Sequence, residues 1–483
     1  MQNTAILRIL GLIIIIFSAS MLPSIGINFI YSDGNYLPFL VSFIITLAAG
    51  FILWFPFRNS RKELKIRDGF LIVVLIWTVL SLFGALPFLL ARIPDVTFTD
   101  AIFETVSGLT TTGANVFHHL QQMPHDILYY RQQLHMLGGM GIIVLAVAIL
   151  PMLGVGGMQL YRAETPGPIK DSKLYPRITE TAKTLWYIYL GLIAICTLFY
   201  WLAGMNFFDA IGESYSTIST GGFSLHDNSF GFYHSLTIDT IASIFMLLAA
   251  ANFGLHFAFL QKRSVKTYWK DPEFRLFISI VAVVTIITMI VLSIYHVFEN
   301  PGATFVHALL GATSLQTTTG FTDSNFAYWP SFLPFLIMLT PIIGGCAAST
   351  AGGMKVIRFS LIFKQAKREL TCLLHPKAIV NIKFGQQTLS TQIIHSMWGF
   401  IAVYFILYVA LLLMLLATGL DFTTAFGTLS SCITNAGAGI GKIATTYDIL
   451  NPTSKWLMIF AMIAGRLEFL TIFVLFTPAF WRR

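Results

Sequence analysis

Apolar stretches of about twenty residues recur along this chain, and they constrain its fold more than any other feature. A stretch of roughly 18 or more residues with few charges is long enough to cross a bilayer as a helix. The sequence predicts an all-α polytopic membrane protein with ten spans, at residues 9–31, 37–57, 70–91, 134–153, 185–202, 236–260, 276–297, 332–363, 393–416 and 456–476. Charged residues are only 11% of the chain, against about 25% in soluble domains. This composition excludes a cytosolic enzyme, a secreted disulfide scaffold and a disordered protein.

Lysine and arginine are segregated between alternate loops. Of the 30 basic residues, 25 lie at the two termini or follow the second, fourth, sixth and eighth spans. The exceptions are Arg92, Arg131, Lys442 and Lys455 in the other loops and Arg466 inside the last span. Loops rich in basic residues stay in the cytoplasm, so both termini are expected there. Topology thus accounts for the net charge of +8, and nucleic-acid binding is not needed to explain it.

No pattern in the sequence indicates a catalytic or metal centre. The four cysteines form no CxxC pair, and His118, His119, His135, His256 and His307 show no HExxH or recurrent ligand spacing. The glycine-rich stretch before Lys442 resembles a phosphate loop, but Ala436 and Ile443 occupy positions where that motif requires Gly and Ser or Thr. We therefore expect neither an enzyme nor a bound cofactor, and transport energy must come from the membrane potential or a partner.

Four outer loops share a repeated pattern. Each holds a half-length apolar segment that ends in a cluster of Thr, Ser and Gly: AIFETVSGLTTTG, AIGESYSTISTGG, ALLGATSLQTTTG and AFGTLSSCITNAG, closing at Gly113, Gly222, Gly320 and Gly437. The closing glycines are 109, 98 and 117 residues apart, which indicates repeats of about a hundred residues. We predict an N-terminal two-span pair at 1–68 and four span–half-helix–span repeats at 69–183, 184–274, 275–385 and 386–483.

These loops have the chemistry of a cation filter. Non-helical backbone at membrane depth is tolerated only where protein buries it or where it lines a watery cavity. Glycine can turn its carbonyl inward at positive φ, and rings of carbonyl oxygens replace the hydration shell of potassium. The half-helices are expected to begin at Asp100, Asp209, His307 and Thr424, the aspartates and Thr424 as N-caps, and to aim their negative carboxyl ends at a shared axis. Close packing of helices through small residues is the alternative interpretation.

The predicted filter consists of sixteen residues, four from each repeat. They are Thr110, Thr111, Thr112 and Gly113; Ser219, Thr220, Gly221 and Gly222; Thr317, Thr318, Thr319 and Gly320; and Thr434, Asn435, Ala436 and Gly437. Glu104 and Glu213 lie at matching places in their half-helices. They could concentrate cations near the filter or hydrogen-bond to backbone and orient a loop.

The eighth span contains two glycine pairs, Gly344-Gly345 and Gly352-Gly353, which are expected to break the helix. A polar, glycine-rich loop just inside a filter could obstruct the pore and move, whereas a static packing kink is the alternative. Arg466 is expected to face protein or a cavity, because burying a charge in a span costs at least about 2.5–3.5 kcal/mol. Its expected partner is a carbonyl of the glycine-rich loop or a pore-lining carboxylate.

The motifs together resemble the Trk/Ktr/HKT superfamily of cation transporters. The endings TTTGA, STGGF, TTTGF and TNAGAG, with LYRAETPGPIKD, GGCAASTAGGMKVIR and GRLE, are similar to the bacterial Trk branch across the whole chain. The resemblance implies potassium binding at the filter residues, potassium as cargo, and an intramembrane gate at the glycine-rich loop, with Arg466 below the filter to hold it shut. Serine at the first closing position accompanies sodium transport in plant relatives, so Gly113 favours potassium.

The resemblance also implies how such a protein is assembled. A homodimer is expected in the bacterial inner membrane, each protomer with its own pore, together with a cytoplasmic ring of the nucleotide-binding regulator TrkA, which would bind NAD, ATP or ADP. The expected function is gated potassium uptake driven by the membrane potential. A carrier that couples potassium to protons or sodium is the main alternative. A membrane-embedded enzyme or scaffold is a remoter one.

Overall fold

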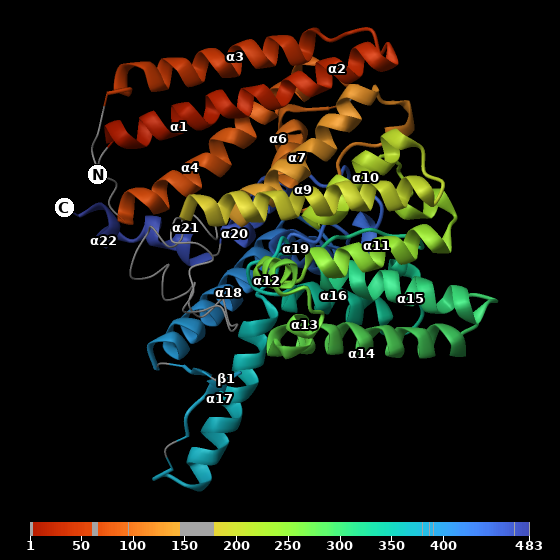
Figure 1. The fold of residues 1–483 in the computed structure, drawn as a ribbon, viewed down its shortest axis with the longest axis vertical. Helices are drawn as coiled ribbons and strands as arrows, with labels where there is room; N and C mark the ends of the chain where they lie inside the picture. Colours follow the sequence, from red (N-terminus) through yellow and green to blue (C-terminus); the bar gives the residue numbers. More distant parts are fainter. Residues whose placement is uncertain are drawn as a thin grey trace.

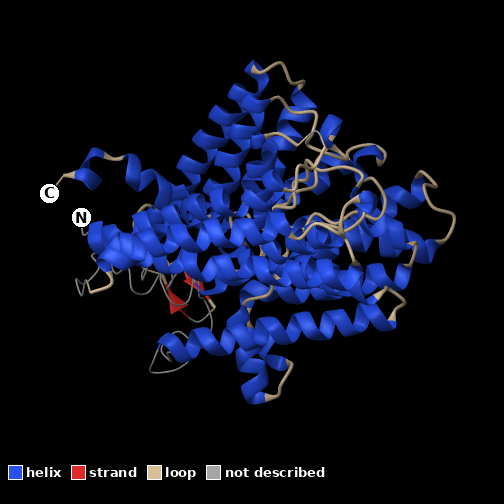
Figure 2. Cartoon of the chain, turned by 90° about the horizontal axis from the view of Figure 1, so that it is seen from above, coloured by secondary structure: helices blue, strands red, loops and turns tan. Residues whose placement is uncertain are grey.

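The structure is a computed structural model, and it describes residues 3–59, 66–94, 96–144, 178–378, 380–385, 387–389, 391–467 and 469–482. The described chain is helical almost throughout (Figures 1 and 2). Its two strands, β1 (Lys383–Phe384) and β2 (Gln387–Thr388), form one short antiparallel hairpin. The predicted all-α polytopic fold is therefore confirmed.

An N-terminal helical pair lies along one edge of the molecule (Figure 1). It comprises α1 (Asn3–Ser18), η1 (Ala19–Met21), α2 (Leu22–Tyr31), α3 (Leu37–Trp54) and η2 (Phe55–Phe57). Gly11 and Gly50 lie where the helices touch, and a methyl group on Gly11 would come within 2.8 Å of the Gly50 carbonyl oxygen. Small residues allow this close approach between membrane helices. The Asn28 amide donates to Asp126 at 2.8 Å and ties the pair to the next helices.

The remaining helices follow the order span, half-length helix, loop, span four times. The first set is α4 (Ile66–Gly84), α5 (Leu86–Leu90), α6 (Phe98–Leu109), η3 (Leu120–Gln122) and α7 (His125–Val144). The second is α9 (Ile178–Leu202), α10 (Phe207–Ser219), η6 (Ser229–Tyr233), α11 (Leu236–Ala249) and α12 (Phe253–Lys262), followed by α13 (Lys266–Lys270). The third is α14 (Pro272–Ile294), α15 (Pro301–Gln316), η7 (Phe326–Tyr328), α16 (Leu333–Ile343) and α17 (Val356–Leu374). The fourth is α18 (Thr391–Ala417), α19 (Phe422–Thr434), η8 (Gly441–Ile443), α20 (Pro452–Arg466), α21 (Phe469–Phe476) and α22 (Pro478–Trp481).

Six helices in the described chain are long and apolar enough to cross a membrane unbroken. Two predicted spans are instead bent pairs: α11 and α12 meet at 93°, and α20 and α21 meet at 111°. The eighth span is also not a single helix, because α16 ends at Ile343 and α17 begins only at Val356. In Figure 1, α17 projects away from the bundle. The fourth predicted span, 134–153, leaves the described residues after Val144, and the LYRAETPGPIKD segment lies outside them.

The four half-length helices are α6, α10, α15 and α19, of 12, 13, 16 and 13 residues. At 1.5 Å per residue they span about 18–24 Å, less than the bilayer core of about 30 Å. Each has an N-cap whose side-chain oxygen accepts a backbone N–H of the first turn: Thr97, Asn206, Asn300 and Asp421.

The prediction that Asp100, Asp209 and Thr424 are N-caps is therefore wrong. Each lies three residues inside its helix. The Asp100 carboxylate accepts from the Thr97 backbone N–H at 3.1 Å and completes a capping box. His307 is also internal, because α15 begins six residues earlier at Pro301. The repeated apolar segments of the sequence therefore predict that the four half-length helices exist but not where their first turns begin.

Candidate functional site

The four closing glycines form a ring in which each repeat touches the next. A Cβ atom on Gly113 would collide with the Gly221 carbonyl oxygen, one on Gly222 with that of Thr319, one on Gly320 with that of Ala436, and one on Gly437 with that of Thr112. All four separations would be below 3.0 Å, which real Cβ atoms essentially never show. The contacts run from repeat one to two, three, four and back to one. The segments therefore surround a common centre.

The backbone of the four segments has the same conformation at two positions. The closing glycines have φ between +72° and +87°. Two residues before each of them, Thr111, Thr220, Thr318 and Asn435 have φ between +50° and +58°. Left-handed backbone is unusual for β-branched residues such as threonine, so surrounding contacts must hold it in place. Backbone strain of this kind clusters at functional sites and ligand clamps.

The predicted filter residues other than the glycines are essentially inaccessible to solvent. In repeats one and three the threonine hydroxyls pair in the same way: Thr110 with Thr112 at 2.7 Å, and Thr317 with Thr319 at 2.8 Å. The structure thus brings all sixteen predicted residues into one ring. Their part in binding an ion stays a prediction.

The two segments that depart from TTTG do so for local reasons. Gly221 stands where the other segments have Thr or Ala because the His135 ring occupies the space of its Cβ. His135 itself hydrogen-bonds to the Ser216 hydroxyl at 3.0 Å. In repeat four, Asn435 donates to the Thr112 hydroxyl at 2.9 Å, across the boundary between repeats four and one. Asparagine also adopts left-handed backbone more readily than most residues.

Outside the ring lies a cavity of about 320 Å³. Its wall includes all four closing glycines together with Asp227 and Asp323 from the loops that follow. The half-helices α6, α10, α15 and α19 end three or four residues before those glycines. Their carboxyl ends bring partial negative charge to the ring, so the field there favours a cation.

Glu104 and Glu213 orient loops and do not face the cavity. Both are fully buried. Glu104 accepts the backbone N–H of Val116 at 2.9 Å, and Glu213 accepts that of Leu225 at 2.9 Å, in each case three residues past the closing glycine. The second of the two interpretations drawn from the sequence therefore fits the structure.

Two basic residues that we placed in outer loops are buried inside helices. Arg131 in α7 pairs with Glu104 at 2.7 Å, and its guanidinium lies over the Phe223 ring at 4.4 Å. Lys455 in α20 pairs with Asp100 at 2.6 Å and so joins repeat four to repeat one. Hydropathy could not have found these pairs, because their partners are 27 and 355 residues away.

The twelve residues between α16 and α17, residues 344–355, form a loop directly behind the ring. Gly344 and Gly353 both have φ of +74° and cross within contact distance of each other. The Gly352 N–H donates to the Thr318 hydroxyl at 2.6 Å, and the Gly353 N–H donates to the Thr434 carbonyl at 3.1 Å. The loop therefore touches the filter segments of repeats three and four.

Breaks in three of the four second spans meet at this loop. The Thr350 hydroxyl lies 3.1 Å from the carbonyl oxygens of both Ile218 and Ala249, and its one hydrogen is donated to these two acceptors. The Cys346 N–H donates to the Ala250 carbonyl at 3.0 Å, at the bend between α11 and α12. Backbone groups freed by a broken membrane helix need such partners, so the breaks and the loop stabilise one another.

Arg466 ends α20 at the third break. Its Nη1 donates to the Thr350 carbonyl at 3.0 Å. Of the two kinds of partner expected from the sequence, the structure therefore shows a carbonyl of the glycine-rich loop. The adjacent Gly465 lies against the Ile433 carbonyl, and a side chain there would force α20 away from the end of α19. The four loop glycines and Arg466 thus belong to one hydrogen-bonded assembly.

These features define a class: an α-helical membrane protein in which four half-length helices point their carboxyl ends at one ring of backbone. Comparison with known proteins is consistent with that geometry. The family model described as TrkH, cation transport protein, matches residues 38–483, and the chain belongs to this family.

Similar proteins match along the full length of both chains. The Trk system potassium uptake protein TrkH of Salmonella typhimurium is 51% identical over 482 residues, with 100% of each chain covered. The Trk system potassium uptake protein TrkG of Escherichia coli is 39% identical over 486 residues, again with 100% of each covered. The crystal structure of the potassium transporter TrkH from Vibrio parahaemolyticus superposes with a TM-score of 0.92 at 46% identity, covering 100% of both chains.

Proposed function

We propose that this protein carries potassium into the cell through a single pore in each protomer. The main support is that the four filter segments form a closed ring at the base of one cavity. Full-length similarity to proteins named for potassium uptake supports the choice of ion. The sixteen filter residues would bind the ion, with backbone oxygen replacing its water. An inside-negative potential supplies about 2.3 kcal/mol per charge per 100 mV, which is sufficient to drive accumulation.

The loop behind the ring would act as the gate. Of its glycines, Gly352 and Gly353 lie against the filter segments, while Gly344 packs on Gly353 and Gly345 packs on Ala250 at the bend between α11 and α12. Arg466 donates to the Thr350 carbonyl. A loop in this place obstructs the path until it moves. Because it is held by a few hydrogen bonds, a regulator could shift the balance with a modest free energy.

The proposed function also requires a particular oligomeric state and a particular orientation in the membrane. The chain would form a homodimer in the bacterial inner membrane with both termini in the cytoplasm, and a TrkA-type nucleotide-binding ring would control the gate. The basic loops on the predicted cytoplasmic side support the orientation. The division into 1–68, 69–183, 184–274, 275–385 and 386–483 remains part of the same proposal, as does the absence of a cofactor other than the transported ion.

Purified protein in planar bilayers tests this function directly. We expect discrete current steps under a potassium gradient and much smaller currents under an equal sodium gradient. Recordings with and without the ring partner and its nucleotides test the control of opening. Saturable flux that stops when the proton or sodium gradient is removed, without discrete steps, would instead establish the coupled carrier.

A further inference from the structure

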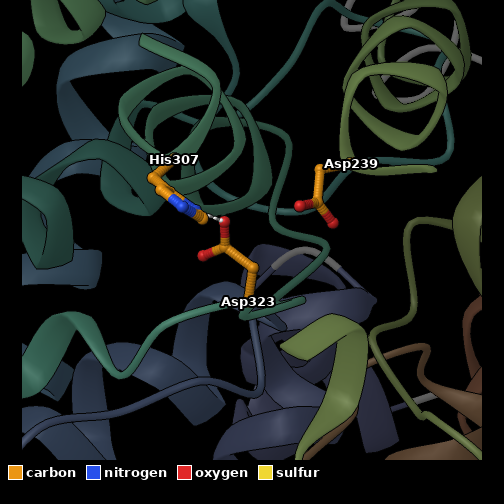
Figure 3. Close-up of side chains that lie close together, drawn as sticks. All are labelled: Asp239, His307 and Asp323. Atoms are coloured by element: carbon orange, nitrogen blue, oxygen red, sulfur yellow. Dashed lines mark hydrogen bonds and ion pairs between the residues drawn. The ribbon is translucent and has the colours of Figure 1, made fainter. Parts of the chain in front are cut away.

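Three side chains of types that can bind a metal ion lie close together where repeat two touches repeat three, next to the cavity outside the ring. They are Asp239 in the first turn of α11, His307 in α15, and Asp323 in the loop after the third filter segment (Figure 3). Their nearest ligand atoms all lie within 4.8 Å of one another. His307 hydrogen-bonds to Asp323, and in Figure 3 the Asp239 carboxylate faces this pair.

The ion pair between His307 and Asp323 does not account for the position of the Asp239 carboxylate beside it. The residue is only 3% exposed, and its Oδ1 atom has no hydrogen-bond partner among the described residues. A buried carboxylate oxygen without a partner is costly, and buried charges are usually paired or coordinate metals. The carboxylate of Asp323 lies near it, and His307 pairs with Asp323, so this Asp239 oxygen is left without a partner in the cluster.

Repeat two contains a matched pair without the third ligand. Asp209 lies 13 residues before its closing glycine, as His307 does, and pairs with His226 at 2.8 Å. There the neighbouring side chain is Tyr233, whose hydroxyl donates to Asp209 at 3.3 Å. An aspartate–histidine pair therefore recurs in repeats two and three. Beside the His307–Asp323 pair, α11 of repeat two contributes the further carboxylate of Asp239, which has an oxygen without a partner among the described residues.

We propose that Asp239, His307 and Asp323 bind one divalent transition-metal ion, with zinc as the fitting probe. Two carboxylates and one imidazole are a three-ligand set that leaves a fourth position for water. Zinc–ligand bonds of about 2.0–2.2 Å require the ligand atoms to close to within roughly 4 Å of one another, which small side-chain rotations supply.

The surroundings preorganise this site and connect it to the pore. The His307 ring stacks on Phe298 with ring centroids 4.2 Å apart. Gly231 of η6 packs on the Asp323 backbone, and its N–H donates to the Thr322 carbonyl at 3.3 Å. Asp323 also lines the outer cavity, so a bound ion would place positive charge beside the path of entering cations and link repeats two and three.

Zinc binding to the full-length protein in lipid nanodiscs tests the proposal, by equilibrium titration in the absence of potassium flux. We expect one zinc ion per protomer, with affinity reduced by about tenfold or more in Asp239→Asn and Asp323→Asn, since changes around metal ligands cost about 10–100-fold. Asp209→Asn, in the matched pair, should bind zinc as the unaltered protein does. This readout is separate from transport, so it can fail while the proposed function stands.

A second measurement keeps the test decisive if a variant does not fold. The zinc K-edge absorption spectrum of the unaltered protein should show oxygen ligands and one imidazole at about 2.0–2.2 Å. Absence of saturable binding, or equal loss in Asp209→Asn and Asp239→Asn, would overturn the proposal. So would a spectrum of water oxygens alone, which indicates an adventitious ion only.

Discussion

At the scale of single residues, each closing glycine satisfies two requirements at once. Its φ is positive, and its missing side chain leaves room for the carbonyl of the neighbouring repeat. Only the space for the neighbouring carbonyl is needed to close the ring. Gly204, between α9 and α10, has φ of +104° but nothing within 4 Å of a Cβ atom, so it separates the two effects.

We expect Gly222→Ala to lower potassium flux by at least about tenfold, while Gly204→Ala leaves flux nearly unchanged. Both variants incur backbone strain of about 1–3 kcal/mol, but only Gly222→Ala pushes a carbon into the Thr319 carbonyl. Isotope uptake into proteoliposomes, at matched protein content, measures the difference. Equal loss in both variants would show that backbone strain, and not the ring contact, matters.

Sequence patterns predicted the residues of the ring but not the residues that hold it. The Thr, Ser and Gly clusters are visible because they repeat at fixed spacing. His135, Arg131 and Lys455 occur once each, and their meaning depends on partners in other repeats. The grouping of Asp239, His307 and Asp323 was not predicted for the same reason, since these residues come from three separate segments.

At the scale of helices, hydropathy predicted where the apolar stretches lie, but it did not predict that some of them are broken into two helices. It reads α11 with α12, and α20 with α21, as single spans, because composition does not change across the breaks. The breaks depend on whether the freed backbone groups find partners, and residues 344–355 supply these at the first of the two bends. The glycine pairs predicted the third break because they alter the local backbone directly.

The contact between the loop and α20 depends on Arg466, whose guanidinium donates to the Thr350 carbonyl. We expect Arg466→Ala and Arg466→Gln to raise potassium flux by between about twofold and thirtyfold, because removing a unit charge close to the proposed ion path changes the energy of a passing cation by roughly 0.5–2 kcal/mol. Arg466→Lys keeps the charge and should leave flux low. Current recordings without the regulator distinguish the variants.

The three Arg466 variants also separate charge from hydrogen bonding. Glutamine can still donate to the Thr350 carbonyl, so high flux in Arg466→Gln assigns the barrier to charge. Low flux in Arg466→Gln with high flux in Arg466→Ala assigns it to the hydrogen bond. Unchanged flux in both would remove Arg466 from the gate and leave it a structural residue.

At the scale of the whole molecule, the repeats explain why one chain can build a fourfold site. Each repeat alone would expose a half-helix and a polar loop to lipid, where backbone groups cannot be left without partners. Four together bury these loops against one another. The ion pair of Lys455 with Asp100 and the hydrogen bond of Asn435 to Thr112 close the circle between the last repeat and the first.

We propose above that the ring of Gly113, Gly222, Gly320 and Gly437 encloses the place where the transported ion is held. Anomalous diffraction from crystals soaked in rubidium or thallium tests it most directly, because these heavy monovalent ions substitute for potassium and can be located. We predict a peak on the line enclosed by the four segments, lost when sodium replaces the heavy ion. A reproducible peak elsewhere, with none inside the ring, would show that the ion is not held by these four segments.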